Sequence, residues 1–194
     1  MGAPKYSVVA PVFHEAESLP EFHRRTRAVM DGLDGAAELL LVDDGSSDGS
    51  LEIMRALQAE DASVRVLSLS RNFGHQVAIT AGMDFARGEA VVVIDADLQD
   101  PPEVILDLVA EWQRGAELVL AVRAARRGET WFKRITAALF YRLIDRLTDL
   151  HIPKDSGDFR LMDRKVVDAL QQVREHHRFM RGLSVWVGFK RAEV

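Results

Sequence analysis

Five short apolar runs, separated by segments with helical periodicity, most constrain how this chain can fold. Each run has five to seven residues and shows no regular alternation of apolar and polar side chains. Strands that are apolar on both faces are typical of parallel sheets covered by helices on both sides. The order of runs therefore predicts an α/β fold with a mostly parallel sheet flanked by helices on both faces. The predicted strands cover residues 6–12, 38–42, 64–69, 90–94 and 118–122.

The segments between and after these runs carry helix signals. Ser18 and Glu21 have the S-x-x-E spacing of a capping box, which predicts a helix ending near residue 31. The Pro-Pro pair between Asp100 and Glu103 predicts a helix up to residue 113, because proline is tolerated in a first turn. The FRLMDR segment predicts a short strand, after which Asp163 is expected to cap a helix through residue 173. The other predicted helices end near residue 59 and cover residues 76–87 and 130–147.

The bulk properties limit the class of protein. The chain has 194 residues without an internal repeat or an obvious linker, which predicts one domain over residues 1–194. Its formal net charge of -5 argues against a general nucleic-acid binder, so no nucleic-acid partner is expected. It has no cysteine, which excludes disulfides and thiolate metal sites. No apolar run reaches the roughly 18 residues of a membrane span, so the chain is expected to be soluble.

Several common motifs are absent from the sequence. No G-x-G-x-x-G follows the first strand, and neither a P-loop nor a G-x-S-x-G nucleophile elbow occurs. The histidines form no zinc pattern with acidic partners. His75, His151, His176 and His177 are therefore expected to be structural or exposed.

Polar side chains gather where the predicted strands end. In an open parallel sheet, ligands bind at the carboxyl ends of the strands, so these side chains are expected to share one site. Acids follow the second and fourth strands, and arginines follow the third and fifth. The polar and aromatic residues at these ends include Phe13, His14, Glu15, Asp43, Asp44, Arg71, Asn72, His75, Asp95, Asp97, Gln99 and Arg123.

Asp95 and Asp97 are the acids that structure alone explains least, since they crowd the end of a buried strand. Two carboxylates about 4 Å apart repel by roughly 4 kcal/mol at an effective dielectric near 20. Either one of them is protonated or a cation lies between them. A hard divalent cation takes oxygen ligands and usually also contacts substrate phosphates. Asp97 and Gln99 could offer such oxygens, while Asp95 could serve the metal or a ribose hydroxyl.

Other charged residues have simpler explanations. Asp48 is expected to be a turn or cap residue without a site role, and Asp43 and Asp44 could be the same. Asp100 and Glu103 are expected to be helix-start acids. The arginines within residues 123–134 could line a solvated face, but the apolar residues after them favour phosphate or membrane-surface contact.

Five segments occur in the order in which one known family carries them. They are PVFHE, VDDGSSDGS, RNFGHQ, DADLQDPPE and DSGDFRLMDR, and they span nearly the whole chain. Together they resemble glycosyltransferase family two, and more closely its polyprenyl-phosphate glycosyltransferases, the dolichol-phosphate mannose synthase-like group. The resemblance implies a GT-A (Rossmann-like) fold, a nucleoside-diphosphate-sugar donor, a Mg²⁺ or Mn²⁺ cofactor and inversion at the sugar carbon.

The resemblance also implies roles for residues of the donor half. Asp97 and Gln99 are implied as metal ligands, with Asp95 as a third. The residues implied in nucleotide binding are Pro11, Phe13, Glu15, Asp43, Asp44, Arg71, Asp95, Ala96 and Arg123.

At the transfer site, the resemblance implies Asp158, Arg160 and Arg134. Asp158 is expected to act in transfer or to organise the arginines, and Arg134 matches a basic position near the acceptor phosphate. The family usually has Asn where His14 stands, and His14 is expected to make the same loop-holding hydrogen bond.

The implied reaction moves one sugar to a polyprenyl phosphate, such as undecaprenyl or dolichyl phosphate, at the cytoplasmic face of a membrane. The family normally continues beyond the position of Val194, so membrane contact is expected through a C-terminal region that this sequence lacks. Two alternatives stay open: transfer to a soluble glycan or polysaccharide, and a nucleotide-sugar-binding module without turnover. The identity of the sugar, uridine versus guanosine in the donor, and assembly into a homo-oligomer also stay open.

Overall fold

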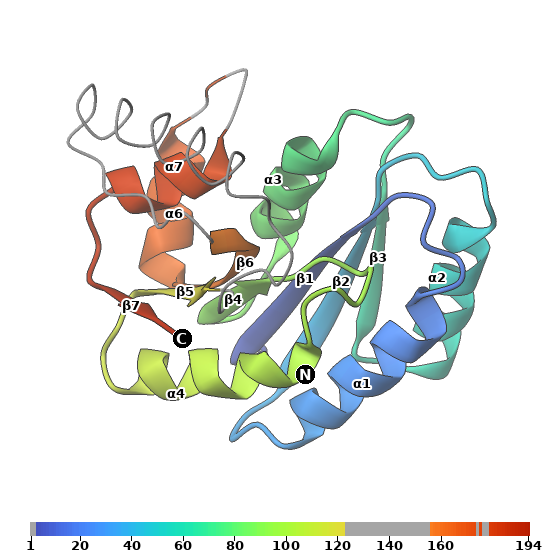
Figure 1. The fold of residues 1–194 in the computed structure, drawn as a ribbon. Coiled ribbons are helices and arrows are strands. Elements are labelled where there is room, and N and C mark those ends of the chain that lie inside the picture. Colours follow the sequence, from blue (N-terminus) through green and yellow to red (C-terminus); the bar gives the residue numbers. More distant parts are fainter. Residues whose placement is uncertain (1–2, 123–155, 174, 176–178) are drawn as a thin grey trace, which may run out of the picture.

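A computed structural model describes residues 3–122, 156–173, 175 and 179–194 (Figure 1). The predicted helix over residues 130–147 lies outside this part of the chain, as do Arg123, Arg134, His151, His176 and His177.

The described strands form one sheet of seven strands. Its order is β3-β2-β1-β4-β6-β5-β7, and the pairs among β1, β2, β3 and β4 are parallel. The strand after residue 155 runs antiparallel to both of its neighbours, whereas the last strand pairs parallel with β5. The mostly parallel sheet is thus confirmed. The strands are β1 (Tyr6–Val12), β2 (Ala37–Asp43), β3 (Val64–Ser68), β4 (Ala90–Val93), β5 (Leu118–Val122), β6 (Ser156–Asp163) and β7 (Arg191–Glu193).

Helices cover both faces of the sheet, as predicted (Figure 1). Alternate residues of β1 point to opposite sides: Val8 joins the core under one set of helices and Val9 the core under the other. The first face carries α1 (Leu19–Asp31), α2 (Ser50–Glu60) and α4 (Ile105–Gln113), the last preceded by a short 3-10 helix (Pro102–Val104). The second face carries α3 (His75–Phe85), α6 (Arg164–Gln172) and α7 (Met180–Trp186).

The two predicted helix caps have different outcomes. Asp163 caps α6 as expected, because its carboxylate accepts a hydrogen bond from the Lys165 backbone N–H. The capping box of α1 is wrong. The Ser18 hydroxyl donates to the backbone carbonyl and carboxylate of Glu15, and Glu21 pairs with Arg24 instead of returning to the cap.

The direction of β6 decides which residues meet at the edge where the parallel strands end. Val93, the last residue of β4, pairs with Arg160 in the middle of β6. An antiparallel neighbour begins where a parallel one would end. The residues before Arg160 therefore lie beside the loop that follows β4.

Among the described residues, none of the helices has the length and apolar character of a membrane span.

Candidate active site

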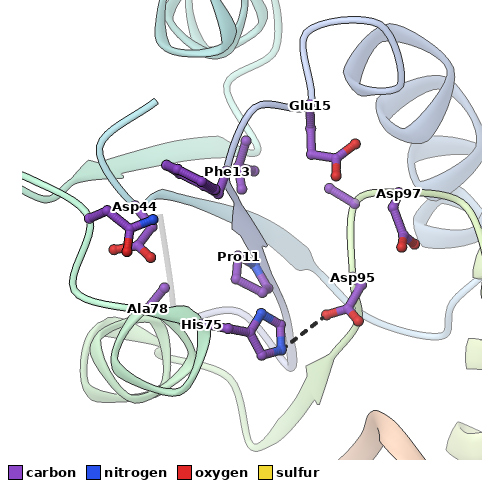
Figure 2. A pocket seen from close by; sticks show the side chains of 11 residues that line it. Pro11, Phe13, Glu15, Asp44, His75, Ala78, Asp95 and Asp97 are labelled. Atoms are coloured by element: carbon purple, nitrogen blue, oxygen red, sulfur yellow. Dashed lines mark ion pairs between the residues drawn. The ribbon is translucent and has the colours of Figure 1, made fainter. Parts of the chain in front are cut away.

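A cavity of about 280 Å³ opens at the carboxyl ends of β1, β2 and β4, next to the start of α3 (Figure 2). Acids from three separate loops face it, together with one histidine and one aromatic ring. This is where the sequence places the ligand site. The lining residues are Pro11, Val12, Phe13, Glu15, Asp44, Asn72, His75, Ala78, Asp95, Ala96 and Asp97.

The loop after β1 is held by His14. Its backbone N–H donates to the Ser46 hydroxyl over 3.1 Å, and its ring Nε2 lies 3.1 Å from the Ser47 hydroxyl. His14 has a left-handed backbone (φ 58°), which Asn and His adopt more readily than most residues. Its ring stacks on Phe13 with 4.1 Å between centroids. The loop-holding role expected for His14 is therefore present, and it sets Phe13 at the cavity.

The two acids after β2 shape neighbouring loops. Asp44 lines the cavity, and its carboxylate accepts hydrogen bonds from the backbone N–H groups of Phe73 and Gly74 (2.8 and 2.9 Å). Asp43 is buried outside the lining and accepts hydrogen bonds from the Ser46 backbone and the Ser68 hydroxyl. These hydrogen bonds support a structural role for both Asp43 and Asp44 in holding the adjacent turns.

Gly45 lets these loops approach each other closely. It has a positive φ of 74°, and a Cβ there would meet the backbone of Arg71 and Asn72 at 2.5 Å. The Arg71 side chain lies outside the cavity lining, with its guanidinium 4.0 Å from the centre of the Phe73 ring. Its predicted contact with the nucleotide stays a prediction.

The acids after β4 provide the groups that suit a metal. Asp95 Oδ1 is buried and finds no hydrogen-bond donor among the described residues. The pKa of Asp95 is raised, mainly because the carboxyl is buried. The nearby acids Asp158, Asp97 and Asp100 raise this pKa further, whereas His75 lowers it. Asp97 faces the same cavity, and its Oδ1 accepts the backbone N–H of Gln99 at 3.0 Å.

These residues fit a divalent cation that shares its coordination with a substrate. No group of three or more His, Cys, Asp or Glu in the described part of the chain could hold a metal by itself. Mg²⁺ is commonly held by one or two carboxylates together with substrate phosphates, which Asp95 and Asp97 can provide for. Gln99 is exposed and lies outside the cavity lining, so its role as a ligand stays a prediction.

Asp158, at the start of β6, lies at the centre of a polar cluster. Its carboxylate accepts hydrogen bonds from Arg160 (3.1 Å), from two nitrogens of Arg181 (3.1 and 3.2 Å) and from the Gln76 amide (3.3 Å). His75 Nε2 lies 3.3 Å from its Oδ2. Burial alone would raise the pKa of Asp158, but hydrogen bonds from His75 and Arg181 and the charges of both arginines hold it well below its usual range.

Arg160 is enclosed rather than directed into the cavity. Its guanidinium donates to the backbone carbonyls of Gly157 and Met180 and to the Ser184 hydroxyl, besides Asp158. Burial lowers its pKa to about 10, so it stays charged at neutral pH. Arg160 therefore connects β6 to α7 through its hydrogen bonds to Met180 and Ser184.

His75 is exposed, as expected, and its side chain also belongs to the site. It lines the cavity and lies 3.5 Å from Asp95 Oδ1 (Figure 2). Asn72 also lines the cavity, and Gln76 and Arg181 contact Asp158. The RNFGHQ segment was a signal for three of these residues, but nothing in the sequence pattern marked Arg181.

Two predictions about surrounding acids are consistent with the structure. Asp48 lies outside the cavity lining, accepts hydrogen bonds from Ser50 and the Ala16 backbone, and has a pKa of about 2, lowered mainly by the Ser50 hydroxyl. Glu103, in the short helix before α4, forms a two-bond ion pair with Arg25 of α1. Both acids therefore have structural partners.

An open α/β sheet with paired acids after a central strand and a cavity at the strand ends is typical of the GT-A class of folds. Residues 7–171 match the family described as Glycosyl transferase family 2, and the chain belongs to that family. The family resemblance and the fold expected from it are both confirmed.

Individual proteins of this family are similar to the chain over nearly its whole length. The uncharacterized glycosyltransferase YkcC of Bacillus subtilis is 54% identical over 190 residues, which cover 98% of this chain and 59% of that protein. The bactoprenol glucosyl transferase of Shigella phage SfV is 43% identical over 184 residues, covering 95% and 60%. The chain thus spans about 60% of the length of these curated relatives.

Solved structures share the fold at low sequence identity. Mannosyltransferase PcManGT from Pyrobaculum calidifontis, in complex with GDP-Man and Mn²⁺, superposes with a TM-score of 0.70 at 18% identity and covers 100% of this chain and 55% of its own. TarS from S. aureus in complex with UDP-GlcNAc gives a TM-score of 0.65 at 16% identity, covering 98% and 56%.

Proposed function

We propose that the protein is a metal-dependent, inverting glycosyltransferase that moves a sugar from a nucleoside-diphosphate-sugar to a polyprenyl phosphate. The observation that carries this proposal is one cavity that combines the acids Asp95 and Asp97 with the Phe13–Glu15 loop. Relatives named bactoprenol glucosyl transferases, at 43% identity, support a polyprenyl phosphate as the acceptor. Since that acceptor is a lipid, we assign the reaction of the whole protein to the cytoplasmic face of a membrane.

In the donor half, the nucleoside occupies the cavity with Phe13 as a stacking face and Pro11 and Ala96 along its walls. Asp95 and Asp97 would hold Mg²⁺ or Mn²⁺ beside the donor diphosphate. Such a cation, when bound, supplies Lewis-acid stabilisation of the charge that develops on the leaving diphosphate. Asp43 supports this half indirectly through the loop that it fixes.

In the transfer half, Asp158 and Arg160 have positioning roles. The Asp158 carboxylate is occupied by donors from three side chains, which suits an anchor for Arg181 better than a general base. A strong base is not required, because the acceptor phosphate is already anionic. Arg123 and Arg134, outside the described residues, are assigned to the donor diphosphate and the acceptor phosphate.

The donor half is tested by calorimetry of UDP and GDP binding with and without Mn²⁺. In Asp97→Asn, affinity with Mn²⁺ should fall about tenfold or more, because one anionic oxygen ligand is lost. Affinity without metal should not change. The matched control is Glu60→Gln, an exposed acid outside the cavity. An equal loss with and without metal contradicts the ligand role of Asp97.

The acceptor is tested by transfer of radiolabelled sugar to polyprenyl phosphate and, separately, to soluble glycans. The assay uses both the 194-residue chain and a protein extended to the length of the curated relatives. We expect the extended protein to transfer sugar to the lipid phosphate, and the 194-residue chain to bind donor but transfer poorly. If the extended protein transfers sugar only to soluble glycans, the alternative acceptor is established; if the extended protein binds donor without any transfer, it is a binding module.

A further inference from the structure

His75 occupies a position that the assignments above leave unused. It is the first residue of α3, and its ring points to the end of β4 (Figure 2). A single ring nitrogen, Nε2, lies 3.5 Å from Asp95 Oδ1 and 3.3 Å from Asp158 Oδ2. The two carboxylates belong to different parts of the site, since Asp95 lines the donor cavity and Asp158 anchors the arginines.

The surroundings define the state of this nitrogen. An unprotonated nitrogen would direct a lone pair at two acceptors, so Nε2 carries the proton. Both distances exceed the usual 2.7–3.2 Å of an N–H···O bond, so the ring attracts each carboxylate electrostatically without forming a close hydrogen bond. The His75 side chain is 42% exposed and lines the cavity, which separates it from a core histidine.

The contact matters most to Asp95. The buried Oδ1 of Asp95 has no hydrogen-bond donor among the described residues, and the His75 N–H is the polar group that faces it. Asp158 is fixed independently by Arg160, Arg181 and Gln76. A side chain that contacts both acids can therefore fix the position of Asp95 relative to Asp158.

We propose that His75 is a positioning residue that orients Asp95 for the metal-bound donor by tying it to the Asp158 cluster. This proposal rests on the proposed function, because it requires Asp95 to bind a metal–diphosphate. It requires an N–H at the position of Nε2 and does not require a charged ring. The requirement separates His75 from a residue that only fills space at the start of α3.

The test compares His75→Gln with His75→Asn by calorimetry of UDP and GDP with and without Mn²⁺. The Gln amide nitrogen stands as many bonds from the backbone as Nε2, whereas the Asn amide is one carbon shorter. With Mn²⁺, His75→Asn should lose about tenfold or more in affinity, because an interaction with a charged carboxylate is removed. His75→Gln should recover most of that loss. Without metal, wild type and both variants should bind nucleotide alike.

Two neighbouring variants separate positioning from general damage. Val77→Ala alters an exposed side chain of the same helix and should bind as wild type does. Gln76→Leu removes another donor from Asp158 but leaves the Asp95 contact in place, so its loss should be smaller than that of His75→Asn. Thermal melting of each variant shows whether the fold is retained.

The outcomes distinguish this proposal from the proposed function. If wild type binds nucleotide with metal and His75→Asn binds equally well, the role of His75 is overturned while the metal site stands. A loss in His75→Asn that His75→Gln does not recover, or that Gln76→Leu matches, also overturns it. If wild type shows no metal-dependent binding, the proposed function fails, and the role of His75 fails with it.

Discussion

Asp158 shows how one carboxylate can organise several cations. It is only 5% exposed, and the Arg160 side chain beside it is buried even more completely, at 3%. Removing one partner of a buried ion pair leaves the other charged and desolvated, which costs far more than losing an exposed pair. The stability of this corner of the fold should therefore depend on the charge of a single side chain.

Asp158→Asn should lower the free energy of unfolding at pH 7 by about 3 kcal/mol or more. The measurement is urea unfolding followed by circular dichroism. Asp168→Asn is the matched control, because Asp168 is exposed and its carboxylate lies 3.9 Å from Arg164. The control should change stability by less than about 0.5 kcal/mol. Equal effects of the two substitutions would contradict the anchoring role of Asp158.

The same pair of proteins should show a defined pH dependence. The pKa of Asp158 is lower in the folded chain than its ordinary value, so its contribution is complete above about pH 5 and is lost as the pH falls further. Because Asp158 also raises the pKa of His75, the stability gap between wild type and Asp158→Asn should first widen as His75 becomes protonated and then shrink below about pH 4. A gap that keeps widening below pH 4 would show that the folded-state pKa of Asp158 is raised instead.

At the scale of elements, α3 is placed by a close approach to the sheet. A Cβ on Gly82 would lie 2.2 Å from Cγ1 of Val9 in β1 and 3.0 Å from Cγ2 of Val42 in β2. The absence of a side chain at Gly82 lets the helix lie against both strands. This packing also sets the height at which His75 and Ala78, on the same helix, reach the cavity.

Gly82→Ala should destabilise the fold by about 1–3 kcal/mol, since the core must shift to accept the extra methyl group. Gly32→Ala is the matched control, because its backbone is right-handed and the nearest atom to the new Cβ would be 3.4 Å away. Chemical unfolding of both variants measures the difference. If the two variants unfold alike, α3 does not pack on the sheet as closely as described.

The sequence predicted those elements that carry a local signal. Strands β1 and β5 match their predicted ranges residue for residue, because each is a continuous apolar run. The capping box failed because the Ser18 hydroxyl bonds to Glu15 before the helix, while Glu21 pairs with Arg24. The helix α7 and the strand β7 were not predicted. Their residues carry no long apolar period, and β7 forms only because β5 offers it an edge.

The candidate site divides in the same way. Its donor half follows strand ends, so Phe13, Asp44, Asp95 and Asp97 could be placed from the order of strands alone. The cluster around Asp158 depends on the reversed direction of β6, which no residue pattern specifies. Arg181 meets Asp158 only after that reversal, and sequence reasoning could not connect them.

At the scale of the whole molecule, the central sheet needs strands from the C-terminal part of the chain, after residue 155, to be complete. β6 lies between β4 and β5, so until β6 is in place β4 is paired only with β1 and β5 has no earlier strand beside it. A chain of residues 1–122 would leave the AVVV edge of β4 and the whole of β5 unpaired. Exposed apolar edges of this kind promote association between chains.

Residues 1–122 expressed alone should therefore aggregate, and co-expression with residues 123–194 should return part of the material to solution. Size-exclusion chromatography of the soluble fraction, with the complete chain as control, makes the comparison. A monomeric and cooperatively melting 1–122 chain would show that the donor half is stable without β6.

Because β6 lies between two strands that precede it in the sequence, β4 is synthesised well before its partner β6 during translation. The chain completes β4 at Val93 and does not begin β6 until Ser156. At about 5–20 residues per second, a ribosome needs roughly 3–13 seconds to make the intervening stretch. Throughout this interval a valine-rich strand edge emerges without its partner. We therefore expect nascent chains to bind ribosome-associated chaperones during this interval of their synthesis.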